Sequence, residues 1–119
     1  LRASIVIDEV TASYIKKLPG DDLRCRKLAR VRPVGMSTDM TVFELLPPLR
    51  LDDTISDESI ALYEKSVDAL IDGRWRESLE LLNGMPVGDR AKDFLMIYVA
   101  TNNYEPPNDW DGVIHMTQK

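Results

Sequence analysis

Cysteine and histidine are almost absent from this sequence, which has Cys25 and His115 as their single representatives among 119 residues. One cysteine excludes a disulfide within the sequence, and one histidine leaves no His/Cys cluster that would hold zinc. Long apolar runs are also missing, since none approaches the roughly 20 residues of a membrane-spanning helix. No basic segment followed by an apolar core opens the sequence as in a signal peptide. We expect a cytoplasmic location without membrane contact by this segment.

The motifs of common catalytic sites are missing as well. No Gly-x-Ser-x-Gly elbow accompanies His115, and neither a Gly-x-Gly-x-x-Gly motif nor a phosphate loop occurs. The acidic pairs Asp21–Asp22 and Asp52–Asp53 lie beside turn or connector residues, where solvated carboxylates are expected. Cys25 is expected to be a small buried hydrophobe rather than a reactive thiol. The residues alone therefore predict no catalytic residue, no metal site and no cofactor in this segment.

Charge is spread unevenly along the sequence. Residues 1–48 carry eight Lys or Arg against six Asp or Glu, and residues 49–119 carry seven against fourteen. The acidic second part should repel nucleic acid, so we expect no nucleic-acid partner. The first part contains a basic run formed by Arg24, Arg26, Lys27, Arg30 and Arg32. This run favours a solvated strand face that guards a sheet edge, and a phosphate-facing patch is the alternative.

The N-terminal 48 residues predict a strand, a helix and two further strands. Ile5–Ile7 has strand propensity, and Asp8 is a good N-cap for a helix that Pro19 and Gly20 end. The apolar face of that helix is predicted from spacing to be Val10, Tyr14, Ile15 and Leu18. Residues 23–34, with imperfect alternation, and 40–46 then predict two strands around a turn at 35–39.

Such a small piece has more apolar surface than its own elements can cover. Domains of this size rarely sustain themselves without disulfides, a metal or a partner. The sequence also begins with Leu1 rather than Met, which favours a fragment of a longer protein. We therefore expect another segment to cover the predicted sheet.

The remainder of the sequence predicts helices. Pro47 and Pro48 end the last strand, residues 49–57 form a polar linker, and Asp57 is a plausible N-cap. Three helices joined by short turns follow, and their predicted inward residues are Ile60, Tyr63, Val67, Leu70, Ile71, Trp75, Leu79, Leu82, Phe94, Leu95, Tyr98 and Val99.

The segment GRWRESLELL has the spacing of the second helix in a tetratricopeptide unit, whose period is about 34 residues. Small residues in this pattern let helix backbones approach closely. We assign Ser66, Trp75, Ser78 and Leu79 as candidate packing or partner-contact residues, with Ala100 as a further small position. The alternative is a generic helical hairpin with Trp75 in its core.

The tail YEPPNDWDGVIHMTQK contains breakers and apolar residues together. Pro106 and Pro107 prevent helix continuation, and Gly112 favours a turn. Trp110 is expected to dock on the helices, and a role as a partner anchor is the alternative. The predicted fold is α+β: a strand-helix-strand-strand piece over 1–48, a linker over 49–57, and a tetratricopeptide-like three-helix segment with an extended tail over 58–119.

Two segments resemble the C-terminal end of a class III adenylate/guanylate cyclase catalytic domain. They are IVIDEVTASYI and RKLARVRPVGMSTDMTVFELLPP. In that family a strand enters a helix and a late hairpin of the form v-x-v-K-G-x-x-x-p-v-x-v-y-e-l closes the sheet, with matching positions here at Val31, Gly35, Val42, Phe43, Glu44 and Leu45. Bacterial members often continue into a tetratricopeptide-like tail ending in W-D-G-V-x-x-x-x-x-K, which is similar to Trp110, Asp111, Gly112, Val113 and Lys119.

The resemblance implies a parent enzyme that converts ATP or GTP to a cyclic nucleotide and pyrophosphate with Mg or Mn. In that family the metal-binding aspartates and the base-selecting residues lie upstream, so no catalytic residue is assigned here. The family often has a lysine before the hairpin glycine, whereas this sequence has Val34 there and Met36 after Gly35. This departure leaves Arg32 as the candidate for phosphate contact, and it is also what a degenerate catalytic domain would show.

The implied role of the segment is that of a non-catalytic regulatory or packing module in signal transduction. Its partners would be the rest of the parent chain or a second copy in a homodimer. A stand-alone tetratricopeptide-like interaction adaptor is the alternative function.

Overall fold

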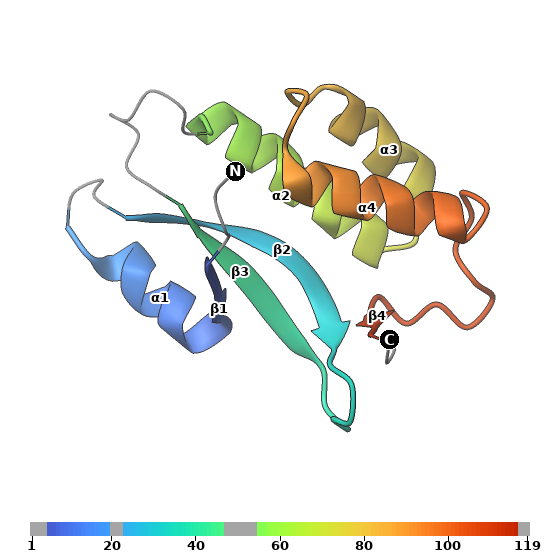
Figure 1. Ribbon diagram of the computed structural model, residues 1–119, viewed down its shortest axis with the longest axis horizontal. Helices are drawn as coiled ribbons and strands as arrows, with labels where there is room; N and C mark the ends of the chain where they lie inside the picture. Colours follow the sequence, from blue (N-terminus) through green and yellow to red (C-terminus); the bar gives the residue numbers. More distant parts are fainter. Residues whose placement is uncertain (1–4, 20–22, 47–54, 117–119) are drawn as a thin grey trace. The chain divides into compact units, whose positions relative to one another are not determined.

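The computed structural model describes residues 5–19, 23–46 and 55–116 (Figure 1). These residues form four helices and a four-stranded mixed sheet, which confirms the predicted α+β class. Several predicted features lie outside the described residues: Gly20, Pro47, Pro48, Lys119, both acidic pairs and most of the linker. None of the helices in the described ranges is long and apolar enough to cross a membrane.

The chain divides into two compact units. The first contains the residues up to Asp57 and those from Ile114 onward, and the second contains Glu58–Val113. The second unit is therefore an insertion within the sequence of the first. The end of the tail, which the sequence analysis grouped with the helices, belongs to the same unit as the sheet.

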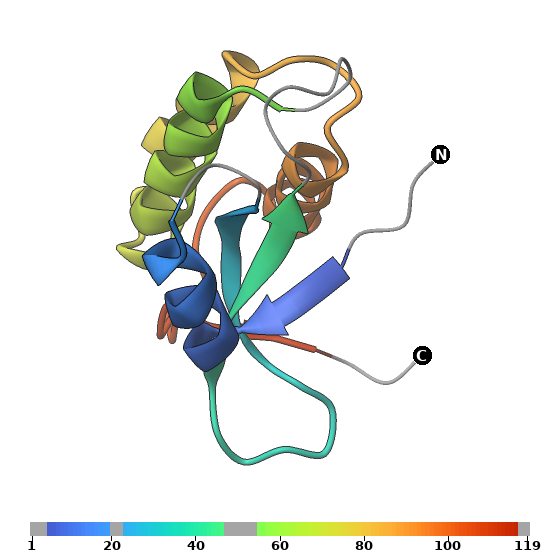
Figure 2. The same cartoon turned by 90° about the vertical axis from the view of Figure 1, so that its left-hand side faces the viewer.

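The first unit contains the sheet and one helix. Its elements are β1 (Ile5–Asp8), α1 (Glu9–Lys17), β2 (Arg24–Arg32), β3 (Met40–Leu46) and β4 (Ile114–His115). The strand order is β1-β3-β2-β4, with β3 antiparallel to β1 and β2, and β4 parallel to β2. Because β3 lies between β1 and β2, α1 is a crossover connection on one face of the sheet (Figure 2).

A β-bulge explains the imperfect alternation that the sequence shows in β2. The pairing register with β3 shifts between Lys27 and Ala29, which leaves Leu28 as the extra residue. A bulge of this kind moves the following side chains to the opposite face of the sheet. Cys25 lies in the core beside α1, whereas Ala29 is buried in register with Val42, on the face that carries Arg26 and Glu44.

Helix α1 begins as predicted but buries a different face. The Asp8 carboxylate accepts a hydrogen bond from the backbone N–H of Thr11 at 2.8 Å, which confirms the N-cap. Ala12 is the buried residue of the helix, and Ile15, which was predicted to face inward, packs against the cluster of Ala12, Cys25 and Phe43.

The predicted inward positions Val10, Tyr14 and Leu18 are wrong, because all three side chains are exposed. They follow one another at intervals of four and form their own stripe, rotated away from Ala12 and Ile15. A helix that packs on one sheet face buries a single stripe of residues. In α1 the stripe that contains Ala12 and Ile15 is the one that packs on the sheet.

The second unit is helical. It consists of α2 (Asp57–Ile71, apart from its first residue), α3 (Trp75–Asn83) and α4 (Arg90–Thr101). Asp57 is the first helical residue rather than the cap before the helix. Asp89 caps α4 by accepting the backbone N–H groups of Ala91 and Lys92.

Most of the inward positions predicted in this unit are confirmed, with one clear exception. Leu95 and Val99 of α4 are fully buried, and so are Tyr63 and Val67 of α2. Phe94 was predicted to face inward, but 45% of its surface is exposed. It precedes Leu95, and neighbouring helix residues point about 100° apart, so burial of Leu95 and Val99 turns Phe94 outward.

Candidate functional site

Three aromatic side chains gather at the C-terminal end of α2. The Trp75 and Trp110 rings meet edge to face at 5.2 Å and 87°, and Tyr98 of α4 lies 5.8 Å from Trp75 and 6.3 Å from Trp110 between ring centroids. Edge-to-face pairs of this kind stabilise a protein beyond the area they bury. Trp110 therefore docks on the helical unit.

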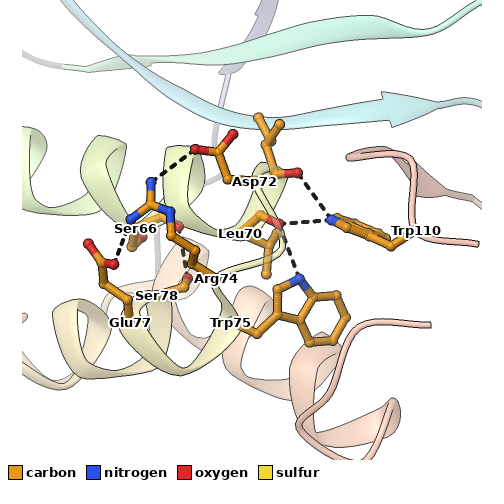
Figure 3. A network of polar contacts seen from close by, with 9 residues as sticks. Ser66, Leu70, Asp72, Arg74, Trp75, Glu77, Ser78 and Trp110 are labelled. Atoms are coloured by element: carbon orange, nitrogen blue, oxygen red, sulfur yellow. Dashed lines mark hydrogen bonds and ion pairs between the residues drawn. The ribbon is translucent and has the colours of Figure 1, made fainter. Parts of the chain in front are cut away.

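Both indole N–H groups donate to the end of α2. Trp75 Nε1 and Trp110 Nε1 lie 3.1 Å and 3.0 Å from the carbonyl oxygen of Leu70, and Trp110 Nε1 is also 3.2 Å from that of Ile71 (Figure 3). The last carbonyls of a helix have no partner within the helix. The two tryptophans satisfy carbonyls that the helix itself leaves open.

The backbone closes the same helix end with a Schellman motif. The N–H of Gly73 donates to Leu70, and the N–H of Arg74 donates to Ala69 at 2.8 Å. Gly73 has a φ of +85°, the left-handed conformation that this motif requires. A turn at Asp72–Gly73 thus joins α2 to α3, and the indole of Trp110 in the tail adds hydrogen bonds to the same helix end.

Ser66 and Ser78 form the close contact between α2 and α3. The hydroxyl of Ser78 donates to the carbonyl oxygen of Ser66 at 2.8 Å, and both residues are fully buried (Figure 3). Trp75 is also buried, so these three residues lie in the interior. Leu79 is half-buried, whereas the other small position, Ala100, is exposed.

A shallow depression opens beside the Trp75 end of α3. It has a volume of about 350 Å³, and its lining is Gly73, Arg74, Trp75, Arg76, Glu77, Tyr104, Glu105 and Pro106. Arg74 forms ion pairs with Asp72 at 3.0 Å and with Glu77. Its hydrogen bond with Glu77, and secondly that with Asp72, raises the pKa of Arg74 above the ordinary value. Its charge is therefore largely compensated within the chain.

Arg32, the predicted phosphate contact, has an acidic partner. Its Nε lies 2.7 Å from Oδ1 of Asp39, across the turn between β2 and β3. An arginine paired in this way offers less charge to a phosphate. Val34 and Met36 of the same turn are exposed.

The sequence did not indicate the buried ion pair of the sheet. Arg26 is 3% exposed, and its Nη2 lies 2.6 Å from Oε1 of Glu44 on β3. The two residues are direct cross-strand partners, so only the strand register brings them together. The basic run was visible in the sequence, but the partner of each cation was not.

Two further groups have shifted pKa values. Hydrogen bonds from Thr11 hold the pKa of Asp8 below its ordinary value. Burial, and to a lesser degree the nearby Asp111 carboxylate, raises the pKa of Tyr98.

The described residues contain no group of three or more His, Cys, Asp or Glu side chains arranged to hold a metal ion.

Among the described residues of the sheet unit, several large apolar side chains are exposed on and near its first two elements. Strand β1 forms one end of the sheet, and β3 is its neighbour there. Large apolar side chains are exposed on β1, on α1 and in the segments that follow α1: Ile5, Val6, Val10, Tyr14, Leu18 and Leu23. We call these six residues the β1/α1 surface. Exposed large apolar side chains and a strand at the end of a sheet are both features of protein interfaces.

Comparison of the chain with protein-family models, with curated proteins and with solved structures finds no match.

Proposed function

We propose that this chain is a non-catalytic packing and regulatory module at the C-terminal end of a class III adenylate/guanylate cyclase. The observation that carries the proposal is the β1/α1 surface: its large apolar residues are exposed, and among the described residues no further strand pairs with the outer edge of β1. A preceding part of the same polypeptide would supply the covering strand and side chains. Because residues 5–48 resemble the end of a cyclase catalytic domain, we propose that this preceding part is the rest of that catalytic domain.

The module contributes structure rather than chemistry. Cys25 is buried, and Arg32 is paired with Asp39, so neither is disposed as a reactive or phosphate-binding group. The parent would convert ATP or GTP to a cyclic nucleotide in the cytoplasm, with Mg or Mn held by upstream residues. The helical insertion would regulate that activity through its packing.

Cyclase assays on the isolated chain, the parent and two parent variants test this proposal. The isolated chain should show no turnover with ATP or GTP and manganese, whereas the parent from the full reading frame should produce a cyclic nucleotide. In the parent, Val10→Asp with Tyr14→Asp should lower activity at least about tenfold, because two charges would be buried at the interface. The control Val87→Asp, at a position that is 96% exposed, should leave activity unchanged. Turnover by the isolated chain, or equal activity of both parent variants, would refute the proposal.

A stand-alone tetratricopeptide-like adaptor is the second candidate. The buried Ser78–Ser66 contact favours it, since small residues at a close helix approach are a feature of such repeats. The reading frame separates the two candidates: the cyclase module requires a catalytic segment with two aspartates upstream of Leu1, whereas the adaptor does not.

A further inference from the structure

Helix α4 is apolar on two sides. Leu95 and Val99 face the interior of the helical unit, while Phe94 and Ile97 are 45% and 66% exposed. Residues 90, 94, 97 and 101 share one helix face, since they are three or four positions apart. We call this the outer α4 face. A helix of a small unit ordinarily has a polar outer side, so two large apolar residues close together there form a candidate contact surface.

The outer α4 face is complementary to itself. Ile97 lies near its middle, Phe94 lies toward the N-terminus, and the smaller residues Ala100 and Thr101 lie toward the C-terminus, all exposed. If two copies of α4 cross antiparallel with the Ile97 residues at the centre, Phe94 of each lies opposite Ala100 and Thr101 of the other. A large side chain then meets small ones on both sides of the axis, as ridges-into-grooves packing requires.

The charges at the two ends agree with the same arrangement. Arg90 is the first residue of α4, and Glu105 follows its C-terminal end, where Tyr104 is also exposed. Antiparallel packing brings Arg90 of one copy to the C-terminal end of the other helix, which has negative partial charge and the Glu105 carboxylate. Parallel packing would place like ends together.

We propose that the outer α4 face binds the same face of a second copy of this chain, forming an isologous dimer about a two-fold axis at Ile97. Isologous contacts are the commonest way in which soluble proteins form dimers. A helix of twelve residues is about 18 Å long, so its contact is smaller than a standard interface and the dimer is weak. This inference is independent of the cyclase proposal, because it concerns the helical unit alone.

Sedimentation of the isolated chain across a wide concentration range tests the dimer. The unaltered chain should show a monomer–dimer equilibrium, and Ile97→Asp should raise its dissociation constant at least about tenfold, or about 1.4 kcal/mol. Val87→Asp is the matched control, since Val87 is apolar and 96% exposed but lies outside α4. A chain that stays monomeric at the highest concentration, or a dimer insensitive to Ile97→Asp, overturns the proposal.

A charge exchange tests the orientation. Arg90→Glu and Glu105→Arg should each weaken the dimer, and the two together should restore it. Both changes suit the helix ends on which they are made, so the variants should fold. Arg90 and Glu105 lie at opposite ends of an element about 18 Å long, so restoration can arise only between two copies. A double variant that dimerises no better than the single variants overturns the antiparallel arrangement.

Discussion

The carbonyl oxygen of Leu70 accepts hydrogen bonds from three donors: the backbone of Gly73 and the indoles of Trp75 and Trp110. Through this one oxygen atom, Gly73 and Trp75, which are close to Leu70 in sequence, and Trp110, which is forty positions away, share a hydrogen-bond acceptor. The tail segment around Trp110 is therefore held to the helical unit by both a ring contact and a hydrogen bond. The sequence indicated docking of Trp110, but it gave no sign of Tyr98 as the third member.

Trp110→Phe separates the hydrogen bond from the ring contact. Phenylalanine keeps an aromatic ring but loses the N–H donor to Leu70 and Ile71, so the free energy of unfolding should fall by about 1 kcal/mol. Trp110→Ala should cost about 2–3 kcal/mol, because the apolar contact is lost as well. Urea unfolding followed by far-UV circular dichroism measures both. Equal losses in the two variants would mean that the ring contributes nothing.

The Arg26–Glu44 pair predicts an asymmetric response to mutation. Arg26→Ala leaves the Glu44 carboxylate, whose side chain is 14% exposed, without its cation, and should cost about 3 kcal/mol. The double variant Arg26→Met with Glu44→Leu removes both charges and should be more stable than Arg26→Ala. Arg30→Ala, at an exposed position of the same strand, is the control. Denaturant unfolding that ranks the double variant below Arg26→Ala would contradict the account.

At the scale of elements, spacing predicted where helices and strands lie better than which face they bury. The described start and end of β3 and the cap at Asp8 follow from local residue chemistry and were predicted. The buried face of α1 does not, because it depends on which stripe fits the sheet. Strand β4 was also missed, since two residues paired in parallel with β2 carry no periodic signal of their own.

The cap of α1 makes part of the stability dependent on pH. Because the pKa of Asp8 is lowered on folding, its contribution is present above the unfolded value near 3.9 and is lost as pH falls through the folded value. Asp8→Asn keeps a good capping side chain that does not titrate. Melting temperatures should show the unaltered chain losing its advantage over Asp8→Asn below about pH 4. A constant difference between the two chains down to the lowest pH would contradict this role.

The turn before β4 depends on close approach as well as on backbone conformation. A Cβ at Gly112 would lie 3.1 Å from Cγ2 and 3.2 Å from the carbonyl oxygen of Ile71, whereas a Cβ at Gly35 would meet nothing within 4 Å. Both glycines have positive φ, at +83° and +79°. Gly35→Ala should therefore cost about 1–2 kcal/mol for the backbone alone. Gly112→Ala should cost clearly more, and equal losses on unfolding would show that the contact with Ile71 relaxes freely.

At the scale of the whole molecule, the helical unit interrupts the sequence of the sheet unit, which is completed by β4. The sheet consequently has different ends: β4 follows β2 at one, while β1 stands at the other. The sequence predicted a shortage of cover for residues 1–48, because few elements had to hide many apolar side chains. The exposed residues of the β1/α1 surface agree with that reasoning, although the sequence alone assigned Val10, Tyr14 and Leu18 to the interior.

Amide hydrogen exchange of β1, measured in the isolated chain and in the longer parent, is the most direct test of the proposal that a preceding segment covers this surface. Rapid exchange is expected at Ile5–Asp8 in the isolated chain, and strong protection is expected in the parent, where a neighbouring strand would pair with the edge. Equal protection of β1 in both proteins would contradict it, because the sheet would then be complete without any upstream partner.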